Sequence, residues 1–123
     1  GFVRYWTLIT IQAKGGTNPV IILEMENMLY DTFPTVQIEA AKSLIQVGKQ
    51  YSISTILKHL NSNDDALSLY AARTFQQMAP FITTIPKLVY EKYLQLKQDA
   101  DNGTLKNNFY KTYTYWALHE TLE

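Results

Sequence analysis

The chain has 123 residues, of which 46% are hydrophobic, and its 11 basic and 11 acidic side chains give zero formal net charge. This length suits a single domain over residues 1–123, and the hydrophobic content predicts a packed core. A balanced charge argues against nucleic acid as a partner, because such partners require a basic excess. No apolar run approaches the ~20 residues of a membrane span, and a chain without cysteine forms no disulfide or cysteine-ligated zinc site.

The first predicted helix covers residues 3–15, where apolar side chains recur at helical spacing. No methionine starts the chain and no capping residue precedes this helix, so we expect a C-terminal fragment cut from a longer protein. From Tyr5 to Ile11 the polar side chains are Thr7 and Thr10 alone. We therefore expect Trp6 to be partly uncovered and to contact upstream polypeptide or, by self-association, a second copy of the chain.

Two later segments repeat one another at an offset of 31 residues: VQIEAAKSLIQVG, residues 36–48, and LSLYAARTFQQMA, residues 67–79. Large apolar positions return as large apolar positions, and Ala40–Ala41 returns as Ala71–Ala72. The small side chains in mid-helix predict the close approach of another helix. We interpret the two segments as copies of one helix in an internal repeat.

The helical phase of the first copy predicts which of its side chains face solvent. On a wheel of ~100° per residue, the apolar side chains of residues 36–47 cover an arc of about 200°. The polar remainder predicted to face solvent is Glu39, Lys42, Ser43 and Gln46. So wide an apolar arc suits a helix that is packed between two neighbouring helices.

Each copy follows a shorter apolar helix, predicted over residues 18–30 and residues 52–60, and a polar joint. Pro34 is expected at the first helical position of its helix, and Asp64 is expected as an N-cap. Gly48 is expected to end its helix as a C-terminal glycine.

A longer unit follows, with helices predicted over residues 85–98, opened by Pro86, and over residues 105–122. Seven helices with short joints predict an all-α chain whose successive helices are antiparallel neighbours. The signature segments of ankyrin and tetratricopeptide repeats are absent, and paired helices with a mid-helix Ala-Ala are typical of short HEAT-like repeats. We therefore predict an α-α superhelix of HEAT-like repeats of about 31 residues.

Three stretches of the chain resemble the C-terminal HEAT-like helical segment of some bacterial sulfatases: FVRYWTLITIQAKG, DTFPTVQIEAAKSLIQVGK and LNSNDDALSLYAARTFQQM. The residues that match its motifs are Val3, Arg4, Tyr5, Trp6, Pro34, Val36, Ile38, Ala40, Ala41, Leu44, Gly48, Leu69, Ala71 and Ala72. The resemblance covers about the first eighty residues, and Arg4-Tyr5-Trp6 is its least generic part. It implies a non-catalytic domain that buttresses the catalytic domain of a sulfatase-like hydrolase, or a subunit contact, in the periplasm or outside the cell.

The same resemblance assigns no catalytic, cofactor or metal residue to this chain. The sulfatase nucleophile is a modified Cys or Ser in a C/S-x-P-S-R motif on an α/β domain with a calcium site, and this chain lacks that motif. The resemblance thus implies that a calcium ion belongs to the parent enzyme. One alternative is a free-standing solenoid that binds proteins through its concave face, and a second is a small helical enzyme of unknown type.

Two other patterns contain residue types that bind metals, but neither has the spacing of a metal site. His59 and His119 have no third ligand at a suitable spacing. His59 is predicted near a helix end, where a histidine interacts favourably with the terminal carbonyl groups. The DADNG stretch, residues 99–103, is out of register with a calcium-binding loop, so a turn is predicted.

Five aromatic residues crowd into the eight positions from Phe109 to Trp116. Aromatic platforms bind sugars, and sulfatase substrates are often sulfated glycans. With no basic cluster nearby to hold a sulfate, we favour packing of these rings onto a neighbouring helix or onto the missing catalytic domain. The candidate interface residues are Tyr5, Trp6, Tyr110, Tyr113 and Trp116.

Overall fold

The computed structural model describes residues 18–123, and this part of the chain is all-α, with six α-helices, two short 3₁₀ helices and no strand. The α-helices are α2 (Pro19–Met28), α3 (Pro34–Gln46), α4 (Ile53–Leu60), α5 (Asp65–Met78), α6 (Lys87–Asp101) and α7 (Phe109–Leu122). The 3₁₀ helices η1 and η2 cover Gln50–Ser52 and Ala79–Phe81. The helix predicted over residues 3–15 lies outside the described residues.

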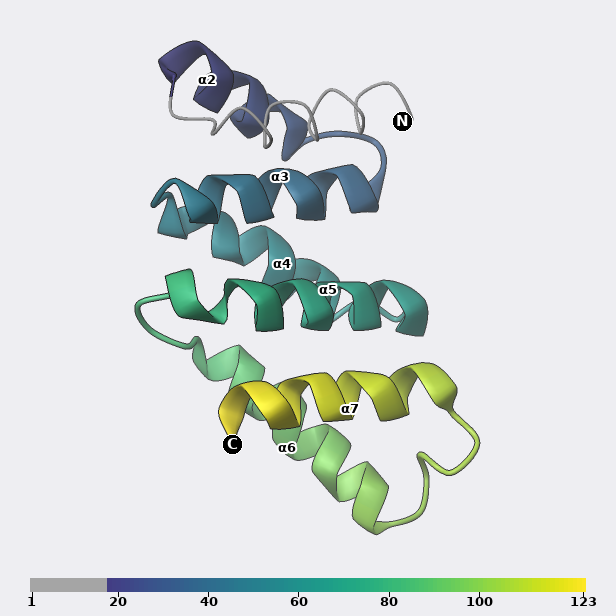
Figure 1. Ribbon diagram of the computed structural model, residues 1–123. Coiled ribbons are helices and arrows are strands. Elements are labelled where there is room, and N and C mark those ends of the chain that lie inside the picture. Colours follow the sequence, from purple (N-terminus) through teal and green to yellow (C-terminus); the bar gives the residue numbers. More distant parts are fainter. Residues whose placement is uncertain (1–17) are drawn as a thin grey trace.

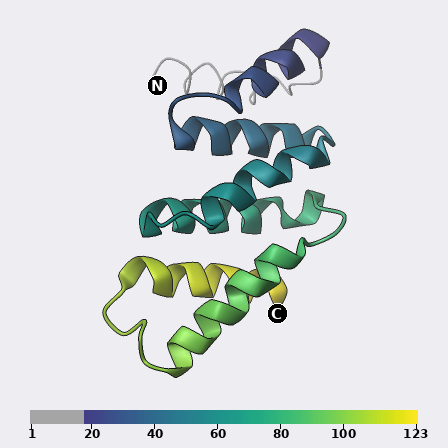
Figure 2. The ribbon, with the colours of Figure 1, turned by 180° about the vertical axis from the view of Figure 1, so that it is seen from behind.

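The helices form a stack with two sides (Figure 1). On one side α3, α5 and α7 run in the same direction, and α5 contacts both of the others. On the other side α4 and α6 slant back in the opposite direction, as seen from behind in Figure 2. Successive helices from α3 to α7 are therefore antiparallel, as predicted. Helix α2 packs against α3 at the end of the stack opposite to α6 and α7.

The core consists of two hydrophobic clusters that run along the stack. The larger cluster joins α3, α4, α5, α6 and α7 around the fully buried Phe75, and the smaller joins α2 to α3 around Met25 and Leu44. Burial of one such large side chain contributes about 1.5–3 kcal/mol to folding. The alanine pairs of α3 and α5 are 0% exposed, which fits the predicted role of small side chains between closely packed helices.

The predicted helix ends of α3 and α5 are confirmed. Pro34 is the first residue of α3, and the Asp64 carboxylate caps α5 by accepting from the backbone N–H groups of Ala66 and Leu67 at 3.1 and 3.3 Å. Gly48 has a φ of 90° after the end of α3. There the N–H of Lys49 donates to the Leu44 carbonyl at 2.9 Å, so the glycine allows a Schellman ending that satisfies carbonyls of the last turn.

The predicted bounds of α6 and α7 were wrong. Pro86 is the N-cap of α6 rather than its first helical residue, and the helix continues past Gln98 to Asp101. There Gly103, with a φ of 77°, allows a second Schellman ending, so the predicted turn at residues 99–103 is in part the last turn of a helix. The last helix begins at Phe109 rather than residue 105, because the side chain of Asn108 accepts from the N–H of Lys111 at 3.0 Å and fixes the start.

The predicted solvent face of α3 was wrong at Ser43. Gln46 is exposed as predicted, and Glu39 and Lys42 are partly buried. The Ser43 side chain is only 3% exposed, and its hydroxyl donates to the Glu39 carbonyl at 3.0 Å. A small side chain whose hydroxyl bonds to its own helix keeps a hydrogen bond when it leaves water, so its burial costs little free energy. This explains why a polar residue can lie inside the fold.

Candidate functional site

Helix α7 carries a row of exposed aromatic side chains. Phe109, Tyr113 and Trp116 are spaced by four and three residues, so they lie on one side of the helix. These three side chains are 66%, 42% and 51% exposed, and Tyr110 beside them is 47% exposed. We call the four residues the α7 aromatic surface. The opposite side of α7, with Thr114 and Leu118, is buried, and so is Ala117 beside Tyr113.

Three rings of the α7 aromatic surface, those of Phe109, Tyr110 and Tyr113, form contacts within it. The Phe109 ring lies 4.5 Å from the Tyr113 ring and 5.8 Å from the Tyr110 ring, measured between centroids. Such contacts reduce the freedom of each ring, so less order has to be gained when a partner binds. Trp116 is held at its other edge, where its ring meets that of His119 at 5.4 Å and 84°.

Polar groups of α5 border this surface. The Arg73 guanidinium carbon lies 5.8 Å from the centroid of the Tyr113 ring, within the range of a cation–π contact. The Gln76 amide donates to the Glu120 carboxylate of α7 at 2.7 Å. The surface therefore combines apolar rings with a polar edge, as the rims of protein interfaces do.

Two hollows flank Tyr113 and Trp116, which line both of them. A hollow of about 380 Å³ lies toward α5, and a hollow of about 490 Å³ lies toward the start of α7. The first is lined by Arg73, Gln76, Tyr113, Trp116, Ala117 and Glu120. The second is lined by Lys106, Asn107, Asn108, Phe109, Thr112, Tyr113 and Trp116. The two rings thus form a ridge with a recess on either side, which is a shape that side chains of another surface can fill.

Of the five clustered aromatic residues, Tyr115 packs inward. Its ring stacks on that of Tyr93 in α6 at 5.7 Å and 3° between planes. The Tyr93 hydroxyl donates to the Glu123 carboxylate at 3.1 Å and lies 2.9 Å from Nδ1 of His119. Burial and the bond to Glu123 raise the pKa of Tyr93 to about 12. The predicted packing onto a neighbouring helix is thus confirmed for Tyr115, and packing onto a further domain stays a prediction for the exposed rings.

His59 lies near a helix end, as predicted, and its side chain is buried there. It lies in the last turn of α4 and is 6% exposed, and its Nε2 lies 2.8 Å from Oε1 of Gln37 in α3. The Gln37 amide nitrogen donates to the Asp31 carbonyl at 2.5 Å, which turns Oε1 toward the histidine. Burial, and secondarily the charge of Lys58, lower the pKa of His59, so the fold favours the neutral ring.

Tyr5 and Trp6 lie outside the described residues. Within residues 18–123, no group of three or more His, Asp or Glu side chains is arranged to hold a metal ion. Among the described helices, none combines the length and apolar character needed to cross a membrane.

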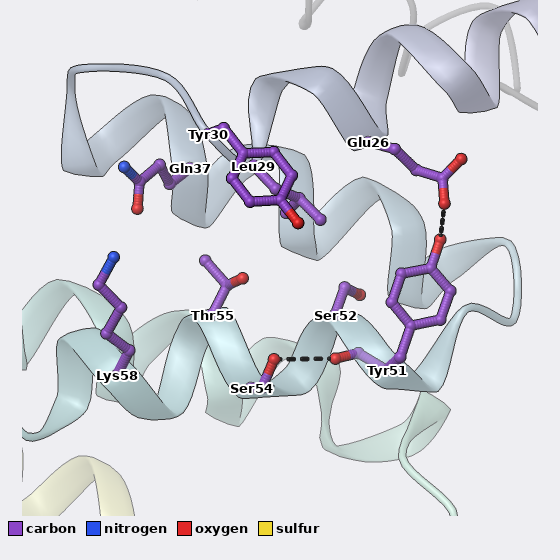
Figure 3. A pocket seen from close by; sticks show the side chains of 9 residues that line it. All are labelled: Glu26, Leu29, Tyr30, Gln37, Tyr51, Ser52, Ser54, Thr55 and Lys58. Atoms are coloured by element: carbon purple, nitrogen blue, oxygen red, sulfur yellow. Dashed lines mark hydrogen bonds between the residues drawn. The ribbon is translucent and has the colours of Figure 1, made fainter.

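A further hollow, of about 340 Å³, was not predicted from the sequence. It opens between α2, α3 and α4, and we call it the α2–α4 hollow. Its lining residues are Glu26, Leu29, Tyr30, Gln37, Tyr51, Ser52, Ser54, Thr55 and Lys58 (Figure 3). They come from three separate segments without a common motif, so only their packing brings them together.

Comparisons with models of protein families, with characterised proteins and with solved structures found no match to this chain.

Proposed function

We propose that this chain is a HEAT-like repeat domain that binds another protein through the α7 aromatic surface and performs no chemistry itself. The observation that carries the proposal is the exposure of Phe109, Tyr110, Tyr113 and Trp116 on a helix whose other side is fully packed. Tyrosine and tryptophan are enriched among the residues that dominate binding at protein interfaces. Exposed rings that contact neighbouring rings and lie beside recesses suit this role better than isolated apolar side chains do.

The HEAT-like character of the proposal is supported by features that recur at the 31-residue offset. The hydroxyls of Ser43 and Thr74 each donate to the carbonyl four residues earlier, at 3.0 and 2.9 Å, and both side chains are buried. Leu44 and Phe75, one position further on, are both 0% exposed. Two helices that repeat packing as well as sequence, side by side in one layer, are expected of a stacked repeat.

The proposed partner is the catalytic domain of a sulfatase-like hydrolase that belongs to the same parent protein. Its support is the resemblance of the Arg4-Tyr5-Trp6 stretch and of the two repeated helices to the C-terminal segment of sulfatases. Such a parent would act in the periplasm or outside the cell, and any calcium ion would lie in its catalytic domain. The alternative is a free-standing solenoid whose partner is an independent protein.

The first test is the nucleotide sequence upstream of the Gly1 codon. A C/S-x-P-S-R motif there supports the sulfatase parent, whereas further helical repeats support the free-standing solenoid. An upstream region with neither feature contradicts both forms of the proposal. In all three cases the isolated chain is expected to leave aryl sulfates and sulfated sugars intact in the presence of calcium.

The second test measures binding of the upstream polypeptide, produced separately, to this chain. Trp116→Asp and Tyr113→Asp are each expected to weaken binding at least tenfold, which corresponds to about 1.4 kcal/mol. Tyr90→Asp, on α6, is a matched control, because Tyr90 is also exposed (46%) but lies outside the α7 aromatic surface. Equal binding by all three variants would show that α7 does not form the interface.

A further inference from the structure

The polar groups of the α2–α4 hollow are held in place before any ligand binds. At one end the Tyr51 hydroxyl donates to the Glu26 carboxylate (Figure 3), and this hydrogen bond, with burial and the charge of Glu26, raises the pKa of Tyr51 to about 12. In the wall, the Ser52 hydroxyl is bonded to the Lys49 carbonyl at 2.8 Å. Gln37 is fixed between Asp31 and His59. A preorganised wall loses little conformational freedom on binding.

Other groups of the hollow retain hydrogen-bonding capacity. Within the described part of the chain, neither the Thr55 hydroxyl nor the Lys58 ammonium has a hydrogen-bond partner, and both line the hollow. The Glu26 carboxylate receives the phenol on Oε2, and a carboxylate has about four lone-pair sites in all. The hollow therefore offers donors on the α4 side and acceptors at the α2 side, spaced along its length (Figure 3).

An aromatic ring stands beside these polar groups. Tyr30, just after the end of α2, is 88% exposed, and Figure 3 shows its ring in front of Leu29, between the Gln37 end and the Tyr51 end. So large an exposed ring at the rim of a hollow offers an apolar face on which a flat or ring-shaped ligand can stack.

The charges of the hollow select among ligands. Glu26 and Lys58 are the charged lining residues, so the lining has no net charge. One ammonium opposed by a carboxylate disfavours a phosphate or sulfate group, which arginine clusters or several lysines bind better. Neutral hydroxyls, which both donate and accept, match a lining that mixes carboxylate, hydroxyl, amide and ammonium groups.

We propose that the α2–α4 hollow binds a neutral saccharide, with one sugar ring stacked on Tyr30 and its hydroxyls bonded to Glu26, Thr55 and Lys58. The volume of about 340 Å³ lies at the lower end of the range of about 300–1,000 Å³ found for ligand sites, as a short saccharide requires. This site is separate from the α7 aromatic surface, and its occupation does not depend on the function proposed for that surface.

The test is a titration of the ¹⁵N-labelled full chain with maltose, cellobiose, lactose and mannobiose, followed residue by residue by NMR. At least one of these neutral disaccharides is expected to give saturable shifts of the backbone amides in residues 26–30 and 51–58. Tyr30→Ala is expected to weaken binding at least fivefold. Tyr90→Ala removes an exposed tyrosine of α6 and is expected to leave binding unchanged.

Two further variants address the polar contacts. Thr55→Val removes a hydroxyl at nearly constant volume, and Lys58→Met removes the charge and keeps the stem, so both are expected to fold and to weaken binding. Absence of saturable shifts with all four disaccharides would overturn the proposal, and so would binding that survives Tyr30→Ala. Galactose 6-sulfate is the charged probe, and tighter binding of it than of galactose would overturn the assignment to neutral saccharides.

Discussion

The phenol of Tyr70 on α5 donates a hydrogen bond to the carboxylate of Glu39 on α3, and the two residues are 31 positions apart. They thus occupy corresponding positions of α3 and α5 at the 31-residue offset. The bond joins these two helices along the side of the stack that α3, α5 and α7 form. A contact between equivalent positions ties the register of one helix to that of the next.

A double-mutant cycle of Glu39→Gln and Tyr70→Phe is expected to show a coupling free energy of about 1 kcal/mol, because both side chains are partly buried and the acceptor is charged. Chemical denaturation of the four proteins measures this coupling. Gln76→Ala with Glu120→Ala serves as a comparison on the exposed surface, where the coupling is expected to be smaller. A coupling near zero for Glu39 and Tyr70 would show that their bond does not tie the helices together.

The alanine pairs provide a test of close packing. Ala40→Leu and Ala71→Leu are each expected to lower the free energy of unfolding by about 1–3 kcal/mol, because both positions are 0% exposed and a larger side chain must displace packed neighbours. Gln46→Leu, on the exposed face of α3, is expected to change it by less than about 0.5 kcal/mol. Urea denaturation measures the free energy of unfolding of all three variants. Equal changes at the three positions would contradict the close packing of Ala40 and Ala71.

The glycine endings of α3 and α6 test the helix termini. Gly48→Ala and Gly103→Ala are each expected to cost about 1–2 kcal/mol, because an L side chain is strained at a φ of 90° or 77°. A Cβ atom at either position would meet no atom within 4 Å, so the cost is conformational rather than steric. Gly48→Asn is the control, since asparagine tolerates this conformation better. A lower unfolding temperature for Gly48→Asn than for Gly48→Ala would contradict this explanation.

Local signals made part of this fold predictable from the sequence. Pro34, Asp64 and Gly48 act through their own backbone or through bonds to residues two to five positions away, so a short window of sequence contains the whole interaction. The buried alanine pairs were predictable because the repeat showed which positions recur.

Features that depend on tertiary packing were not predictable. Ser43 was placed on the solvent face because the wheel treats every hydroxyl as polar, although its hydrogen bond stays inside the helix. Packing onto a neighbouring helix or onto a missing domain was expected for the clustered rings as a group, and no local pattern distinguishes the exposed Tyr113 and Trp116 from Tyr115, which packs on α6. The α2–α4 hollow combines three distant segments, so no single window of sequence contains it.

The N-terminal stretch provides a prediction that rests on sequence alone. The apolar run that includes Tyr5 and Trp6 is expected to cause concentration-dependent self-association of the isolated chain. Sedimentation should show this association weakened by Trp6→Asp and less affected by Trp116→Asp. A strict monomer at high concentration would remove the argument that this stretch contacts another polypeptide.

The last prediction concerns the dependence of stability on pH. The pKa of His59 is lowered by burial, so protonation of this ring favours the unfolded chain, where its pKa is near 6.5. The free energy of unfolding is therefore expected to be highest above about pH 6.5 and to fall as the pH decreases toward the lower pKa of the folded state. Thermal unfolding between pH 5 and pH 8, in steps of roughly half a unit, measures the slope.

His59→Gln separates this histidine from the other titrating groups. Its amide nitrogen can replace Nε2 as the donor to Gln37, so the link between α3 and α4 is kept while the titration is removed. Since every other ionisable group is common to both proteins, the difference between their two pH profiles reports His59 alone. The variant is expected to lose less stability than the natural chain between pH 7 and pH 5. Parallel profiles would mean that His59 is charged as readily in the fold as in the unfolded chain, and that the Gln37 bond holds either form of the ring.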